Sequence, residues 1–121
     1  MKGEYKFLIE GQPLPRPNPK VLRSGIVFYP KKYNQYCQSL KDHIGWQFFN
    51  NEGTQLKGEV NLEIIFHRKG KRKADWENLG KPISDALQAV GVVKNDNQFT
   101  HIRIGILYGA KKPRTEIRVY N

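Results

Sequence analysis

Cysteine, long apolar runs and acidic side chains are all scarce in this chain of 121 residues. Its single cysteine, Cys37, cannot form an internal disulfide, so we expect a reducing compartment. No apolar run approaches the roughly 20 residues that a membrane-spanning helix needs, and the N-terminus lacks the apolar core of a signal peptide. We therefore expect a cytoplasmic protein with no membrane partner.

Several kinds of catalytic site are also missing from the sequence. The three histidines, His43, His67 and His101, show no metal-ligand spacing and have no partner cysteine, which argues against zinc. There is no glycine-rich phosphate loop, and neither Ser39 nor Ser84 lies in a nucleophile elbow. The sequence gives no support to zinc, phosphate-loop or serine-nucleophile chemistry.

Positive charge is what the chain has in excess. It carries 21 Lys and Arg against 11 Asp and Glu, which gives a net charge of +10 and a pI near 9.8. Because the basic residues are clustered, they favour a nucleic-acid partner. The candidate DNA-binding residues are Arg16 and Lys20 in a proline-rich segment, Arg68, Lys69, Lys71, Arg72 and Lys73 in a dense basic run, and Lys111, Lys112 and Arg114 in a basic turn.

The apolar pattern predicts alternating strands and helices. Alternation predicts strands over residues 4–10, 58–67, 101–108 and 115–120, with a short irregular hairpin over residues 21–29. Spacings of three and four predict one helix over residues 31–50 and a second that precedes Gly91. The order β-α-β-α-β-β indicates a single two-layer α+β domain over residues 1–121, with both helices on one face of a mixed sheet.

The second helix has recognisable ends and one awkward residue. Asp75 is suited to the N-cap and Gly91 to the C-cap. Pro82 would lie inside the helix, where proline removes a backbone hydrogen bond. Either the helix begins near Gly80, or its first turn is irregular around Asn78.

Four of the 11 acidic residues follow the basic run directly: Asp75, Glu77, Asp85 and Asp96. Each has an ordinary explanation on its own, as a helix cap, as an i,i+4 partner of Lys81, or as a turn residue. Together they are costly, because carboxylates repel a phosphate backbone. A divalent metal ion would offset that cost.

A metal site requires the acids to converge. If residues 92–93 return along a strand edge, Asp96 comes back near the helix start, beside Asp75 and Glu77. These three carboxylates would then bind Mg²⁺, or Mn²⁺ in its place, and the metal would activate water against a phosphodiester. Lys81, one turn along, could stabilise the charge that develops in the transition state. Trp76, between the two acids, is a candidate substrate contact.

The same residues form a recognisable motif. The segment DWENLGK from Asp75 to Lys81, then Asp85-Ala86-Leu87, Gly91 and the tetrapeptide from Asn95 to Gln98 resemble the signature of the RusA family of Holliday junction resolvases. That signature reads D-x-D-N-L-x-K, then D-A-L, then D-D-x-Q. The basic run and the segment Pro15–Asn18 are also similar to that family.

The resemblance implies a homodimeric, Mg²⁺-dependent endodeoxyribonuclease, often prophage-encoded, that nicks four-way junctions and other branched DNA in recombination and repair. By position, Asp75, Glu77 and Asp96 match the catalytic carboxylates of the family, and Lys81 matches the catalytic lysine. The chain departs from the pattern at Glu77 and Asn95, where the family has aspartate. Two other classes stay open at this point: a non-catalytic basic module that binds nucleic acid, and a phage structural protein.

Overall fold

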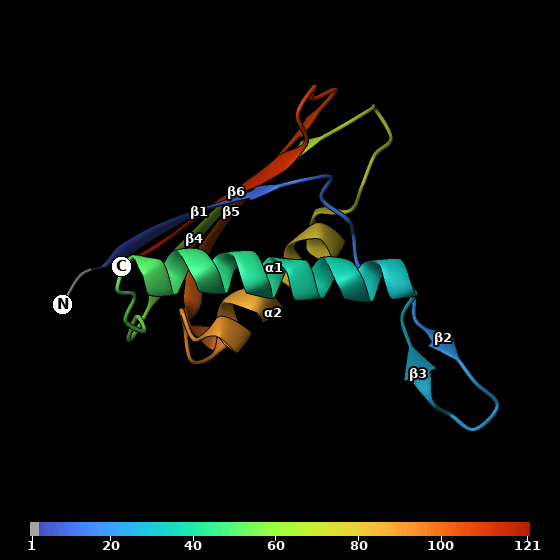
Figure 1. Cartoon of the computed structure of the whole chain (residues 1–121), viewed down its shortest axis with the longest axis horizontal. Coiled ribbons are helices and arrows are strands. Elements are labelled where there is room, and N and C mark those ends of the chain that lie inside the picture. The colour runs from blue at the N-terminus through green and yellow to red at the C-terminus, as the bar shows by residue number, and fades with distance from the viewer. Residues whose placement is uncertain (1–2) are drawn as a thin grey trace.

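In this computed structural model, which describes residues 3–121, a four-stranded sheet carries two helices on one face (Figure 1). The strands lie in the order β1-β6-β4-β5; β4 and β5 are parallel, and the other neighbours are antiparallel. This confirms the predicted α+β class and element order. The elements are β1 (Glu4–Glu10), β2 (Lys20–Val21), β3 (Val27–Phe28), α1 (Lys31–Asn50), β4 (Val60–Arg68), α2 (Trp76–Val90), the 3₁₀ turn η1 (Asp96–Gln98), β5 (Phe99–Tyr108) and β6 (Arg114–Tyr120).

The core lies between the sheet and the helices. Alternate residues of β4 are buried because successive side chains of a strand point to opposite faces. Apolar side chains at helical spacing on α1 and α2 cover the same face. The largest fully buried side chains include Leu40 and Ile44 of α1, Ile64 and Phe66 of β4, and Leu79, Ile83 and Leu87 of α2.

Helix α2 is the crossover between the parallel strands β4 and β5. Parallel strands need such a connection because the chain must return to the end of the sheet at which the first strand began. Arg68, the last residue of β4, pairs with Tyr108 at the end of β5, and Val60 pairs with Phe99 at the other end of the sheet. Helix α2 therefore starts near the end of the sheet where Arg68 pairs with Tyr108. The turn η1 lies near the opposite end, where Val60 pairs with Phe99.

Pro82 lies inside α2 without ending it. The helix begins at Trp76, with Asp75 as N-cap and Gly91 as C-cap, so both predicted caps are confirmed and the alternative start near Gly80 is wrong. The helix is continuous through Asn78, and what differs there is the partner of its carbonyl. The Asn78 carbonyl, four residues before Pro82, accepts a hydrogen bond from the Arg16 backbone N–H at 2.8 Å.

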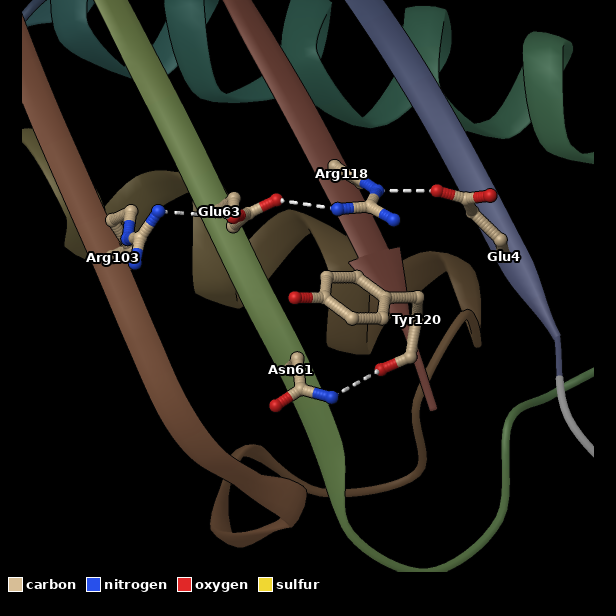
Figure 2. A network of polar contacts seen from close by, with 6 residues as sticks. All are labelled: Glu4, Asn61, Glu63, Arg103, Arg118 and Tyr120. Atoms are coloured by element: carbon tan, nitrogen blue, oxygen red, sulfur yellow. Dashed lines mark hydrogen bonds and ion pairs between the residues drawn. The ribbon is translucent and has the colours of Figure 1, made fainter.

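The sheet face away from the helices carries an ion-pair network (Figure 2). Arg118 bonds both Glu4 and Glu63, and Arg103 also pairs with Glu63. The hydrogen bonds to these two carboxylates raise the pKa of Arg118, and the bond from Arg118 lowers the pKa of Glu4. The two carboxylates of this network, Glu4 and Glu63, are thus neutralised by the two arginines that contact them.

Candidate active site

Asp75 holds the first turn of α2. Its Oδ1 accepts the backbone N–H groups of Glu77 at 2.7 Å and Asn78 at 3.3 Å. These bonds satisfy helix N–H groups that have no partner within the helix. Asp75, Trp76 and Glu77 are all exposed, so two carboxylates and an indole ring stand together at the surface. The capping role predicted for Asp75 is confirmed, and it leaves the carboxylate accessible.

A second group of charges lies one to two turns further along α2. Lys81 Nζ pairs with Asp85 Oδ1 at 3.1 Å. Burial raises the pKa of the nearby Tyr33, Cys37 and the Asp85 carboxylate raise it further, and the Arg16 guanidinium lowers it. Tyr33 of α1 therefore has charges of both signs near its hydroxyl. Lys81 is held by Asp85 on the same helix as the acids at its start.

Asp96 lies at the other end of α2. Its backbone N–H donates to Gln88 Oε1 at 3.1 Å, and its side chain is exposed. Asp75 precedes Gln88 by 13 residues, which is about 20 Å along a helix. Among residues 3–121, no group of three or more His, Cys, Asp and Glu side chains is close enough to hold a metal ion. The expectation that Asp96 returns to the helix start within one chain is therefore wrong, because α2 runs the full length of the crossover.

The turn that carries Asp96 is built by two motif residues whose structural role the sequence did not reveal. Asn95 caps η1, since its side chain accepts the Asn97 N–H at 2.8 Å. Gln98 Oε1 accepts the N–H groups of Lys94 and Asn95, and Gln98 Nε2 donates to the carbonyls of Leu56 and Gly58. The capping role explains how asparagine can stand at position 95: it caps the turn as aspartate would.

Gln98→Ala is expected to lower the free energy of unfolding by about 2 kcal/mol, because four hydrogen bonds of a half-buried side chain are lost. Urea denaturation followed by circular dichroism measures the change. Asn97→Ala is the matched control, since Asn97 is exposed and contributes only its backbone N–H to the turn. A loss below about 0.5 kcal/mol for Gln98→Ala would show that water replaces these bonds.

Three loops meet at the end of the sheet from which the chain leads into α2. They are the proline-rich loop (residues 11–19), the basic loop (residues 68–74) and the β5–β6 turn (residues 109–113). Backbone hydrogen bonds join Gly109 to Gly70, Ala110 to Arg68, and Gly11 to Pro113. The Gln12 side chain also bonds both backbone groups of Lys69. In Figure 1 the proline-rich loop, in blue, passes α2 on its way to α1. The structure thus joins three separate segments that carry most of the predicted basic residues.

These basic residues are not equally free to bind a phosphate. Arg68 donates to the Arg72 carbonyl at 3.2 Å and its Nε is buried, and Arg114 donates to the Lys112 carbonyl at 3.0 Å. Lys20 lies in the β2–β3 hairpin, which projects past the start of α1 (Figure 1). The exposed basic residues of the three loops are Arg16, Lys69, Lys71, Arg72, Lys73, Lys111 and Lys112.

Fold and site together define a small basic α+β protein with surface carboxylates set among cationic loops, as expected of a nuclease. Comparison with known proteins gives the family. The family model described as Endodeoxyribonuclease RusA matches residues 10–120, so the chain belongs to the RusA endodeoxyribonuclease family. The chain is also similar to the crossover junction endodeoxyribonuclease RusA of Aquifex aeolicus (strain VF5). The two are 26% identical over 95 residues, which cover 78% of this chain and 73% of that protein.

No helix among residues 3–121 combines the length and the apolar character needed to cross a membrane.

Proposed function

We propose that the chain is a Mg²⁺-dependent endodeoxyribonuclease that resolves four-way DNA junctions by paired, symmetric nicks. The observation that supports this most directly is the position of Asp75 and Glu77. They are exposed at the start of α2, and the basic loop that ends at Ala74 leads directly into them. A surface that only bound phosphate would be weakened by acids at that point, whereas a nuclease needs them there to hold a metal ion.

The donor set fits magnesium. Asp75, Glu77 and Asp96 offer exposed carboxylate oxygens, the ligand type that Mg²⁺ prefers, and no nitrogen or sulfur ligand accompanies them. When bound, the metal ion would lower the pKa of water and neutralise phosphate charge. The chain itself holds the DNA through its exposed lysines and arginines, and it fixes Asp75 through the two capping bonds of α2.

Lys81 would stabilise the transition state of phosphodiester hydrolysis. Its ammonium is positioned by Asp85 at 3.1 Å, one turn from the carboxylates at the start of the helix. A positioned cation lowers the energy of the negative charge that develops on the leaving oxygen. Asp85 thereby orients Lys81, and its own carboxylate is occupied by that pair.

A second copy of the chain would supply the third carboxylate. β5 is an edge strand, and a two-fold axis beside it would set β5 antiparallel to β5 of the partner. The start of each β5 would then lie beside the end of the other. Tyr108, at that end, is tied to the Ala74 N–H by its hydroxyl at 3.2 Å, next to Asp75. The pairing would also cover part of Ile102, which is 56% exposed on this edge. We therefore propose that Asp96 of one protomer completes the site begun by Asp75 and Glu77 of the other.

The proposed function is tested with a synthetic four-way junction that carries a label on each strand. We expect nicks on two opposing strands in Mg²⁺ or Mn²⁺ and none after chelation with EDTA, because the carboxylates alone cannot activate water. A linear duplex of the same sequence is the control and should be cut far less. Tight junction binding with no cleavage in either metal would contradict the proposal.

That contrary result would favour a non-catalytic DNA-binding module. The observation that favours this alternative is that one chain alone, over residues 3–121, assembles no three-acid metal site. In that case, replacing both Asp75 and Glu77 with neutral residues would raise the affinity for DNA and change nothing else.

A further inference from the structure

Pro82 is a costly residue in its place. It is the seventh residue of α2, it is buried, and an interior proline destabilises a helix by about 3 kcal/mol. Part of that cost is a lost hydrogen bond, because residue 82 has no N–H to donate to the Asn78 carbonyl. In an uninterrupted helix every interior carbonyl is occupied in this way, and none is free for another segment.

The proline-rich loop uses the carbonyl that Pro82 leaves free. The Arg16 N–H donates to the Asn78 carbonyl at 2.8 Å, a short bond for this type. Arg16 lies between Pro15 and Pro17, so its N–H is the only backbone donor in that tripeptide. One free donor in a stretch of prolines thus meets one free acceptor in a helix.

The bond determines where the Arg16 side chain lies. The loop is stiff, because its prolines fix φ and the residues before them are held extended. Its other anchors are Gly11 on Pro113 and Gln12 on Lys69. With its backbone fixed, Arg16 keeps its guanidinium exposed and close enough to Tyr33 to lower the pKa of that hydroxyl.

We infer that Pro82 is a positioning residue: it reserves the Asn78 carbonyl for the Arg16 N–H and thereby fixes the Arg16 guanidinium on the DNA-binding side of the active site. The phosphate role of Arg16 rests on the proposed function, whereas the docking of the loop does not. A free loop would have to be ordered when DNA binds, and that ordering would lower affinity. Because Pro82 leaves the Asn78 carbonyl free, the loop becomes ordered when the protein folds rather than when DNA binds. Arg16 is then already in place.

Pro82→Ala tests the inference, because alanine restores the N–H that competes for the Asn78 carbonyl. Hydrogen exchange of the Arg16 amide, measured without DNA, should become about tenfold faster. Thermal stability should stay the same or rise, since the helix gains a bond. Junction affinity should fall about three- to tenfold, with a weaker dependence on salt, as for the loss of one phosphate contact. Ser84→Ala, which adds no N–H to α2, is the matched control and should change none of these quantities.

A double-mutant cycle separates positioning from a merely structural effect. Arg16→Ala keeps the backbone N–H and removes the guanidinium, so it should lower junction affinity while its amide stays protected. Adding Pro82→Ala to Arg16→Ala should then cost no further affinity. The inference is overturned if the Arg16 amide stays protected in Pro82→Ala, or if the two losses of affinity add. Exchange and binding are both measurable even if the wild-type chain cuts no junction, so a failure of the proposed function would be distinguished from a failure of the docking.

Discussion

Asp75→Asn is expected to slow junction nicking at least about a hundredfold, because it removes a charged ligand from the proposed metal site. The fold should survive, since asparagine caps a helix as well as aspartate does and can accept the same N–H groups of Glu77 and Asn78. Single-turnover cleavage of a labelled junction in Mg²⁺ gives the rate. A parallel binding measurement in Ca²⁺ gives the affinity.

Two further variants make that result specific. Asp75→Ala removes the cap as well as the charge, so it should lose about 1 kcal/mol of stability that Asp75→Asn keeps. Asp42→Asn makes the same chemical change on α1, where Asp42 accepts a bond from Gln38, and should leave nicking unchanged. Cleavage by Asp75→Asn at the wild-type rate would remove this carboxylate from the mechanism.

Cleavage, measured beside affinity, distinguishes a nuclease from a non-catalytic DNA-binding module. Neutralising Asp75 removes a negative charge beside the phosphate backbone, so binding without metal should tighten slightly in both cases. Only a nuclease should lose cleavage at the same time. The non-catalytic module would show the gain in affinity alone.

Much of the fold could be predicted because its signals are local. The burial alternation of β4 and the spacing of Leu40, Ile44 and Phe48 on α1 each depend on a few neighbouring residues. The ends of α2 were equally readable, since Asp75 and Gly91 are typical capping residues. The RusA motif then identified the family, which the family comparison confirmed.

The position of Asp96 could not be predicted, because it depends on contacts between distant segments. From sequence, a few residues separate the end of α2 from Asp96, which made a return to Asp75 plausible. In the structure, η1 is fixed where α2 ends, since Gln98 bonds Leu56 and Gly58 and Gln88 bonds Asp96. No local sequence pattern indicates these partners of Gln98 and Gln88.

Pro82 is a second residue whose role depends on a distant segment of the chain. From its neighbours alone, Pro82 is a defect in a helix, and the sequence left two alternatives: a helix start near Gly80 or an irregular first turn around Asn78. The structure keeps the helix and gives the free Asn78 carbonyl to Arg16, which comes from a loop far away in the chain. A residue that breaks a local rule had a long-range partner that compensates for it.

Because Asp75 and Asp96 lie at opposite ends of α2, we expect that mixing two inactive variants recovers activity. Asp75→Asn and Asp96→Asn should each be inactive alone. If each site takes Asp75 and Glu77 from one protomer and Asp96 from the other, a mixed dimer has one site with all three acids intact and one site with two lesions. Random pairing after co-refolding gives half mixed dimers, so about a quarter of the wild-type sites should return. Nicking of a labelled junction measures this fraction, and the nicks should fall on one strand per binding event.

The matched control places both lesions in the same half of the site. Mixing Asp75→Asn with Glu77→Gln leaves one lesion in each site of the mixed dimer, so no activity should return. Recovery in the first mixture and none in the second would require Asp96 to act across the dimer, because no site within a single chain distinguishes the two mixtures. Equal inactivity of both mixtures would instead mean that each protomer uses its own Asp96. The turn η1 would then have to leave Gln88 and the Gln98 contacts that hold it at the far end of α2.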